Sequence, residues 1–247
     1  SSIDGVISYD YSLVINATTL SPGNHTITFR AKDNYGFWSY NATTPLTVKH
    51  HPRSSIESVS HDSTDENVLI SFTGSASDSD GLVIDYEWYS SLDGVFSNDR
   101  NTTNSSLSVG YHTITFKAKD NDDLWSITSF ESLFINDIPE SNISSQSRYI
   151  SYQNNYTHFN VSFYGNVSDN DGSITHNYWN SSKDGVLSTS GNFTINVNTL
   201  SLGNHTITFQ GRDNYTTWSP KVTTWLVVKA YPNATIVSQS SYSINFG

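Results

Sequence analysis

The amino-acid sequence predicts an all-β protein made of tandem β-sandwich domains. Short runs rich in Val, Ile, Thr, Tyr, Phe and Trp alternate with polar turns, and no long amphipathic helical period occurs. One phrase of twenty residues, LSPGNHTITFRAKDNYGFWS at 20–39, returns in related form at 107–126 and 200–219. Such repetition is typical of a chain built from copies of one structural unit.

The length of the repeated unit matches that of one sandwich domain. His25, His112 and His205 lie 87 and 93 residues apart, and the prolines at 52, 139 and 232 keep the same steps. A unit of about 90 residues is the size of one seven-stranded sandwich. Polar turns that recur every 8 to 12 residues or so are also typical of this architecture.

The first residue falls inside a repeat, because SSIDGVIS at Ser1 corresponds to SSLDGVFS at Ser90 and SSKDGVLS at Ser181. We therefore expect the C-terminal half of a repeat at 1–49, complete repeats at 50–137 and 138–230, and the first strand of a further repeat at 231–247. On this interpretation the chain is a window on a longer linear array.

The strands of the second unit follow from its alternation of apolar and polar residues. In the run YHTITFKAKD, Ile114 and Phe116 point to one side while Thr113 and Thr115 point to the other. We expect strands near 56–60, 67–77, 82–91, 111–120 and 126–135, with two more between 95 and 109.

Two pairs of segments carry a resemblance to a known family: 72–94 (FTGSASDSDGLVIDYEWYSSLDG) with 107–126, and 163–185 (FYGNVSDNDGSITHNYWNSSKDG) with 200–219. Both pairs resemble the PKD-type domain (polycystic kidney disease repeat), an immunoglobulin-like β-sandwich. The family usually has Asp-Phe-Gly-Asp-Gly after its strand Trp, whereas only the last Asp-Gly is kept here, and it commonly has Tyr where this chain has His. The resemblance implies the fold, and roles as spacers, adhesion units, surface-layer building blocks or accessory domains of secreted hydrolases.

Asparagine in an Asn-x-Ser/Thr triplet is the acceptor of N-linked glycans, and the chain has fourteen such triplets. With 25 Asn and 68 Ser plus Thr among 247 residues, composition alone predicts roughly half that number. The excess favours N-glycosylation on an exported surface over chance occurrence. The acceptors are Asn16, Asn24, Asn41, Asn101, Asn104, Asn142, Asn155, Asn160, Asn166, Asn180, Asn192, Asn204, Asn214 and Asn233.

Acidic loops recur at fixed places in the repeat. In an immunoglobulin-like sandwich these loops lie at the end that receives the linker from the preceding domain. Clustered carboxylates there suit Ca²⁺, which prefers six to eight oxygen ligands; alternatively, Asp and Asn cap tight turns without an ion. Calcium would stiffen the junction. The calcium candidates are Asp78, Asp80, Asp120, Asp122, Asp169, Asp171 and Asp213.

The repeated aromatic residues and histidines have structural explanations. Trp88 and Trp179 are predicted to be the buried core tryptophans of their sandwiches. We expect the second set of tryptophans to cap the end of a sandwich, with stacking on sugars as the alternative; its members are Trp38, Trp125 and Trp218.

We expect His25, His112 and His205 to hold the corner where an immunoglobulin-like domain has its Tyr. The linker pair His50–His51 has no second pair at zinc-ligand spacing.

Composition disfavours several classes of function. A formal charge of −11 disfavours nucleic acid and anionic membranes as partners. The absence of cysteine removes disulfides and thiolate chemistry, and no apolar run approaches the length of a membrane-spanning helix. No nucleophile elbow, zinc-protease motif or phosphate-binding loop occurs, so we predict no enzyme in this chain.

These observations predict a structural component of an extracellular, glycosylated fibre, stalk or surface layer on a prokaryotic, archaeal cell. The partners would be other copies or repeats of the same protein, joined in one variant by a terminal strand donated to a neighbouring subunit. One alternative is an adhesin, or a polymer-binding accessory module of a secreted protein that contacts cell-surface polymers. Another is an enzyme whose catalytic domain lies outside these residues.

Overall fold

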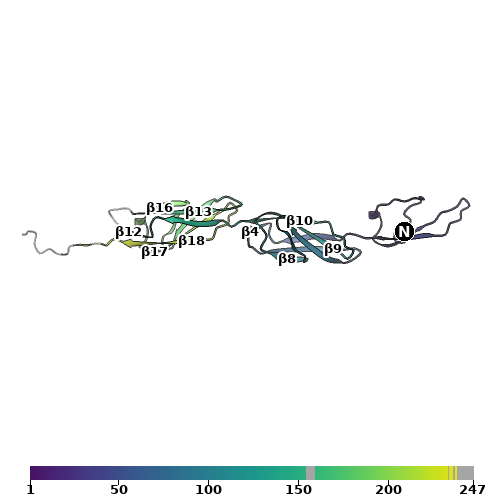
Figure 1. Cartoon of the computed structure of the whole chain (residues 1–247), viewed down its shortest axis with the longest axis horizontal. Helices are drawn as coiled ribbons and strands as arrows, with labels where there is room; N and C mark the ends of the chain where they lie inside the picture. The colour runs from purple at the N-terminus through teal and green to yellow at the C-terminus, as the bar shows by residue number, and fades with distance from the viewer. Residues whose placement is uncertain (154–158, 233, 236, 238–247) are drawn as a thin grey trace, which may run out of the picture. The chain divides into compact units, whose positions relative to one another are not determined.

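The computed structural model describes residues 1–153, 159–232, 234, 235 and 237. The chain divides into two compact units, residues 1–135 and 136–247. Both units are built from β-sheets, with two short 3₁₀ turns as the helical segments among the described residues (Figure 1). The predicted fold class, tandem immunoglobulin-like β-sandwiches, is confirmed by this architecture.

Two sheets of unit 1 form a sandwich. The three-stranded sheet has the order β3 (Arg53–Val59), β5 (Ile70–Ser77), β8 (Asn101–Asn104). The five-stranded sheet has the order β4 (Ser63–Asp65), β10 (Ser129–Asn136), β9 (Gly110–Asp120), β6 (Val83–Ser90), β7 (Gly94–Ser97). Strand β4 was not expected, because three residues are too few to show an alternating pattern.

The core of this sandwich comes from the inward positions of both sheets. Ile114 and Phe116 on β9 are fully buried, as the alternation predicts, and Phe72 faces them from β5. The Trp88 ring lies 4.5 Å from that of Phe116, and its Nε1–H donates to the Arg100 carbonyl oxygen at 3.3 Å. That hydrogen bond lets the indole be buried without leaving its polar atom unpaired.

Unit 2 repeats the same plan. Its three-stranded sheet has the order β11 (Glu140–Gln146), β13 (Asn160–Ser168), β16 (Asn192–Asn196). Its five-stranded sheet has the order β12 (Ile150–Gln153), β18 (Val222–Ala230), β17 (Gly203–Arg212), β14 (His176–Ser181), β15 (Gly185–Ser188), and η2 (Val197–Thr199) follows β16. Trp179 is fully buried and stacks on Phe209 at 4.3 Å, and its Nε1–H donates to the Gly191 carbonyl oxygen at 3.0 Å.

Residues 1–49 contribute one two-stranded sheet, β1 (Gly23–Phe29) paired with β2 (Ala42–Val48), and the turn η1 (Ala17–Thr19). Phe29 is 51% exposed, whereas Phe116 and Phe209 at the same position of the repeat are 0% exposed. The difference arises because no second sheet covers β1 here.

The serine of the Trp-Ser pair that ends the repeated phrase joins the two sheets of each sandwich. Ser126 Oγ accepts the N–H of Ala118 at 3.0 Å and lies 2.7 Å from Ser54 Oγ on β3. Ser219 makes the corresponding contacts with Gly211 N and Ser141 Oγ. One hydroxyl thus ties the end of the long central strand to the first strand of the opposite sheet.

The tail at 231–247 falls largely on residues 233, 236 and 238–247, which lie outside the described part, so the first strand of a further repeat and its donation to a neighbour stay predictions. Within the described residues, none of the helical segments could cross a bilayer.

Candidate functional site

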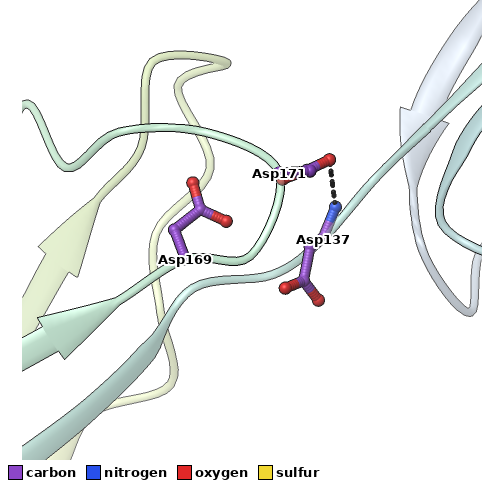
Figure 2. A group of neighbouring side chains, drawn as sticks. All are labelled: Asp137, Asp169 and Asp171. Atoms are coloured by element: carbon purple, nitrogen blue, oxygen red, sulfur yellow. Dashed lines mark hydrogen bonds between the residues drawn. The ribbon is translucent and has the colours of Figure 1, made fainter.

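Three carboxylates gather at one end of unit 2, those of Asp137, Asp169 and Asp171 (Figure 2). One oxygen of each lies within 4.8 Å of the others. Asp137 directly follows β10, whereas Asp169 and Asp171 belong to the loop between β13 and β14. The backbone N–H of Asp137 donates to Asp171 Oδ2 at 3.1 Å, so the entering chain is held by the loop.

The loop is shaped to bring these carboxylates together. Asn170 donates to Asp137 Oδ2 from its side chain at 2.6 Å and from its backbone at 3.2 Å. A Cβ at Gly172 would overlap Asn214 Oδ1 and Asp169 Oδ2, so a larger residue here would displace these two side chains. Asn214 Oδ1 in turn accepts the Ser173 N–H at 2.7 Å, which joins the acidic loop to the neighbouring turn.

Asp213 lies behind the cluster and is almost fully buried. Its Oδ1 accepts the Thr217 N–H at 2.7 Å, and its Oδ2 accepts from Asn136 Nδ2 at 3.0 Å. In unit 1, Asp120 Oδ1 likewise accepts the N–H groups of Asp122 and Leu124 at 2.8 and 2.9 Å. Asp120 and Asp213 therefore cap turns, as the alternative to an ion requires.

The cluster leaves negative charge without a counter-charge. Both carboxylate oxygens of Asp169 and Oδ1 of Asp171 are buried without a hydrogen-bond partner. Burial, followed by the neighbouring carboxylates of Asp171 and Asp213, raises the pKa of Asp169 to about 6. A buried carboxylate in this situation is stabilised by a proton or by a bound cation.

The donor set fits Ca²⁺. All three side chains offer oxygen, the ligand type that a hard cation prefers, and neither sulfur nor imidazole is among them. Three carboxylates provide up to six oxygens, and Ca²⁺ takes six to eight, with water completing the shell. The ion would be held by Asp137, Asp169 and Asp171, and the neighbouring carboxylate of Asp213 would add negative charge that attracts it.

The corresponding place in unit 1 carries its own positive charge. The His50 N–H donates to the Asp80 carboxylate at 3.1 and 3.3 Å, the same contact that joins Asp137 to Asp171. Instead of a third carboxylate, however, the linker has His50, and Lys49 Nζ contacts Asp122. The Asp122 carboxylate raises the pKa of Lys49, with smaller contributions from Asp120 and Asp80.

Asp78 completes the acidic set of unit 1. Its two carboxylate oxygens are buried without a hydrogen-bond partner, and burial together with the Asp80 charge raises its pKa. Of the seven calcium candidates, the structure thus brings two, Asp169 and Asp171, into a three-carboxylate group. The third member, Asp137, was missed; the signal was its place two residues before the linker Pro139.

The three corner histidines share one environment. His112 is buried, its Nε2 lies 2.7 Å from the Ser108 carbonyl oxygen, and its Nδ1 lies 2.7 Å from Ser90 Oγ and 3.5 Å from Asp93 Oδ2. The corresponding sets in the other repeats are Ser1, Asp4, Ser21 and His25, and Ser181, Asp184, Ser201 and His205. The Asp of each set belongs to an Asp-Gly pair, whose role was not predicted from the sequence.

These Ser–His–Asp sets are built differently from a catalytic triad. A triad places Ser and Asp on opposite ring nitrogens, so that the base can take a proton from one side while it is held from the other. Here Ser90 and Asp93 both face Nδ1 of His112, and Nε2 donates to a backbone carbonyl, which can only accept. These contacts join the turn between β6 and β7 to β9, and their role is structural.

The second set of tryptophans lies beside basic side chains at the end of each central strand. Trp125 forms a β-bridge with Lys119 and stacks under Lys117 Nζ at 4.4 Å, and Trp218 forms a bridge with Arg212, whose guanidinium lies 5.4 Å from its ring. Trp38 has the corresponding bridge with Lys32. Cation–π contacts of this kind contribute about 0.5–1 kcal/mol at exposed sites.

The glycan acceptors lie at the surface wherever the structure describes them. Of the twelve described acceptors, ten are exposed, and Asn104 and Asn180 are half-buried. Asn155 and Asn233 lie outside the described residues. Every described acceptor is therefore placed where a glycan can project into solvent.

No protein-family model matches the chain, and no curated protein matches it either. Solved structures share its fold at low identity. The fibronectin(III)-like modules of Clostridium thermocellum CbhA are 17% identical (TM-score 0.34), with 72% of this chain and 94% of theirs covered. The N-terminal eight Ig domains of Down Syndrome Cell Adhesion Molecule are 13% identical (TM-score 0.44), with 84% and 27% covered. Three Ig domains of titin are 14% identical (TM-score 0.43), with 85% and 75% covered.

Proposed function

We propose that this protein is a structural component of an extracellular, glycosylated fibre, stalk or surface layer, with residues 50–137 and 138–230 as two complete PKD-type repeats. Domains in series give length at constant width, and each one mainly needs its neighbours for support. The residues that recur in each repeat lie in turns, corners and cores, which is what a building block requires.

The observation that carries this proposal is the placement of the glycan acceptors. Twelve described acceptors occupy exposed or half-exposed positions on strands and loops of both units. Dense glycans protect a surface from proteases and keep it hydrated, but they leave little room for a substrate to approach the faces that carry them. They also require passage through an export route, which places the protein outside the cell.

Calcium is the second part of the proposal. An ion held by Asp137, Asp169 and Asp171 would tie the residue that enters unit 2 to the loop after β13, replacing mutual repulsion with attraction. Binding to the folded state alone stabilises it by about 2.7 kcal/mol when the ion is 100-fold above its dissociation constant.

Glycopeptide mass spectrometry of protein taken from its native cells tests the glycan part. We expect sugar on most of the twelve described acceptors, and protein recovered from the cell surface. Bare asparagines throughout would contradict the proposal and favour a non-glycosylated binding module. Calorimetric titration with Ca²⁺, after chelator has removed bound metal from the protein, tests the ion separately. We expect one site. Absence of binding at millimolar Ca²⁺ would contradict the calcium part of the proposal and leave the glycan part unaffected.

A further inference from the structure

The outer face of the five-stranded sheet in unit 1 carries a group of exposed aromatic residues. Val95, Tyr89, Thr115 and Phe130 form one continuous row across β7, β6, β9 and β10, since each pairs with the next. Their neighbour Tyr111 lies on the same face of β9, where it contacts the ring of Phe134 at 4.4 Å. Phe130 and Tyr111 are 71% and 73% exposed, so the described residues leave both rings largely uncovered. We call these five residues, 89, 95, 111, 115 and 130, the aromatic face.

Unit 2 has polar residues in place of the three aromatic ones and valine in place of Val95. The corresponding row is Val186, Asn180, Thr208 and Thr223, again across four strands. Asn204 takes the place of Tyr111. The fold therefore accepts polar side chains at these three positions, and packing does not demand the aromatic residues of unit 1.

Both tyrosines replace glycan acceptors. Tyr89 corresponds to the acceptor Asn180, and Tyr111 corresponds to the acceptors Asn24 and Asn204. The following residues are kept, so Asn at position 89 or 111 would by itself restore the triplet Asn-Ser-Ser or Asn-His-Thr. In the sandwich of unit 1, aromatic rings occupy the two positions of this face at which unit 2 has acceptors.

The acceptors that remain in the sandwich of unit 1, Asn101 and Asn104, lie on β8 of the other sheet. A glycan attached there projects from the opposite side of the sandwich. Unit 2, by contrast, carries described acceptors on both of its sheets, including Asn180 on β14 and Asn204 on β17. Neither of the two acceptors in the sandwich of unit 1 lies on the sheet that carries the aromatic face.

Charged side chains on this face lie in two rows, and one lysine is already paired outside them, because Lys119 Nζ binds Asp123 Oδ1 at 2.6 Å. Glu87 on β6 pairs with Lys117 on β9 at 2.9 Å, and Asp85 lies opposite Lys119 in the same ladder. The acidic row thus belongs to β6 and the basic row to β9. A face with one acidic and one basic row can approach an identical face without repulsion.

We propose that the aromatic face docks against the same face of a second copy of this chain. A two-fold axis that runs along the strands between β6 and β9 brings each acidic row over the partner's basic row. An isologous contact of this kind needs a self-complementary patch, and the two charge rows together with the rings provide one. Tyrosine and phenylalanine are also among the residues enriched at the cores of protein interfaces.

The contact is of modest size. Five strands about 4.8 Å apart and about seven residues long at about 3.3 Å each give a plane of roughly 550 Å², below the ~800 Å² per partner of a standard interface. A single contact should therefore be weak, with a dissociation constant on the order of 10–100 µM. In a tandem array, several such contacts acting together would hold neighbouring chains side by side.

This inference extends the proposed function from a chain to its lateral assembly, but its test needs no glycan. Sedimentation equilibrium of the bare 247-residue chain at rising concentration should show the mass climbing from 27.5 kDa toward twice that value. The triple variant Tyr89→Asn, Tyr111→Asn, Phe130→Thr carries the residues that unit 2 has there, so it should fold. We expect it to weaken association at least tenfold.

The control is Trp225→Ser, which removes an exposed ring from the same face of unit 2 and leaves association unchanged. A mass that stays at 27.5 kDa up to about 0.5 mM, well above the dissociation constants expected for a contact of this size, or a triple variant that associates like the wild type, overturns the proposal. If the chain stays monomeric but binds a neutral polysaccharide gel through Tyr89, Tyr111 and Phe130, the face takes a polymer instead. Missing glycans on native protein would contradict only the proposed function.

Discussion

The backbone N–H of Asp137 donates to Oδ2 of Asp171 at 3.1 Å, and this contact holds the residue that enters unit 2 against its acidic loop. Unit 1 makes the same contact between His50 and Asp80. The two linkers therefore dock in the same way but with opposite charge. The side chain of Asp137 adds to the carboxylate cluster of unit 2, while Lys49 offsets the negative charge in unit 1.

This contrast predicts that the linker residues decide whether the loop binds calcium. The double change Asn136→Lys, Asp137→His gives unit 2 the linker of unit 1, and we expect Ca²⁺ affinity to fall at least tenfold in calorimetric titration. The converse change, Lys49→Asn with His50→Asp, should add a second site in unit 1. One bound ion in both variants, as in the wild type, would contradict this role of the linker.

Without a divalent ion, the stability of unit 2 should depend on pH through Asp169. Its pKa in the folded state is about 6, above the ordinary value of 3.8, so the folded form keeps a proton that the unfolded chain releases. Stability from this group is present below pH 3.8 and is lost as the pH rises toward 6. Thermal unfolding in chelator from pH 4 to 7 should show this decline, and Asp169→Asn should flatten it.

The same aspartate gives the calcium site a pH dependence of opposite sign. Because the ion needs the deprotonated carboxylate, Ca²⁺ affinity should rise as the pH increases through about 6. Titration at pH 5 and pH 7 measures this. Equal affinity at the two values would show that Asp169 is not a ligand.

The Asp-Gly turn after the core Trp should contribute to stability through Asp184. Burial alone would raise the pKa of Asp184, but hydrogen bonds from the Ser201 side chain and backbone, with nearby His205, outweigh it and lower the pKa. Asp184→Asn should cost about 1.5–3 kcal/mol at pH 7, the range for hydrogen bonds to charged groups.

This cost has a defined pH dependence. A lowered carboxyl pKa gives stability above the ordinary value of 3.8 that disappears as the pH falls through the folded-state value. Urea unfolding at pH 7 and pH 3 should therefore show a smaller difference between variant and wild type at pH 3. Glu140→Gln, at an exposed carboxylate of the same unit, serves as the control and should change little.

Gly172→Ala should destabilise unit 2, because the added Cβ overlaps Asn214 Oδ1 and Asp169 Oδ2 in the acidic loop. We expect a cost of about 1–3 kcal/mol, which is usual for overpacking, and weaker Ca²⁺ binding as the loop shifts. Gly191→Ala is a matched control, since its Cβ would meet the Gly165 carbonyl oxygen at an ordinary 3.4 Å. Equal loss in both variants in urea unfolding would rule out a specific role of the acidic loop.

The sequence by itself determined the fold class. Alternation in the run at 111–120 placed Ile114 and Phe116 inside, and both are fully buried. Strands that face a core on one side carry this alternation in their residues, so the pattern is local and can be predicted. Strand β4 escaped prediction because three residues with little alternation carry no such signal.

The candidate site and the aromatic face were decided only by tertiary structure. Asp137 is separated from Asp169 by three strands, β11, β12 and β13, and only the folding of the linker onto the loop after β13 brings their carboxylates together. Likewise, Tyr89, Thr115 and Phe130 become one row only through the register of three strands. Residue types are written along the chain, but distances between remote side chains follow from strand pairing and packing, which no local pattern encodes.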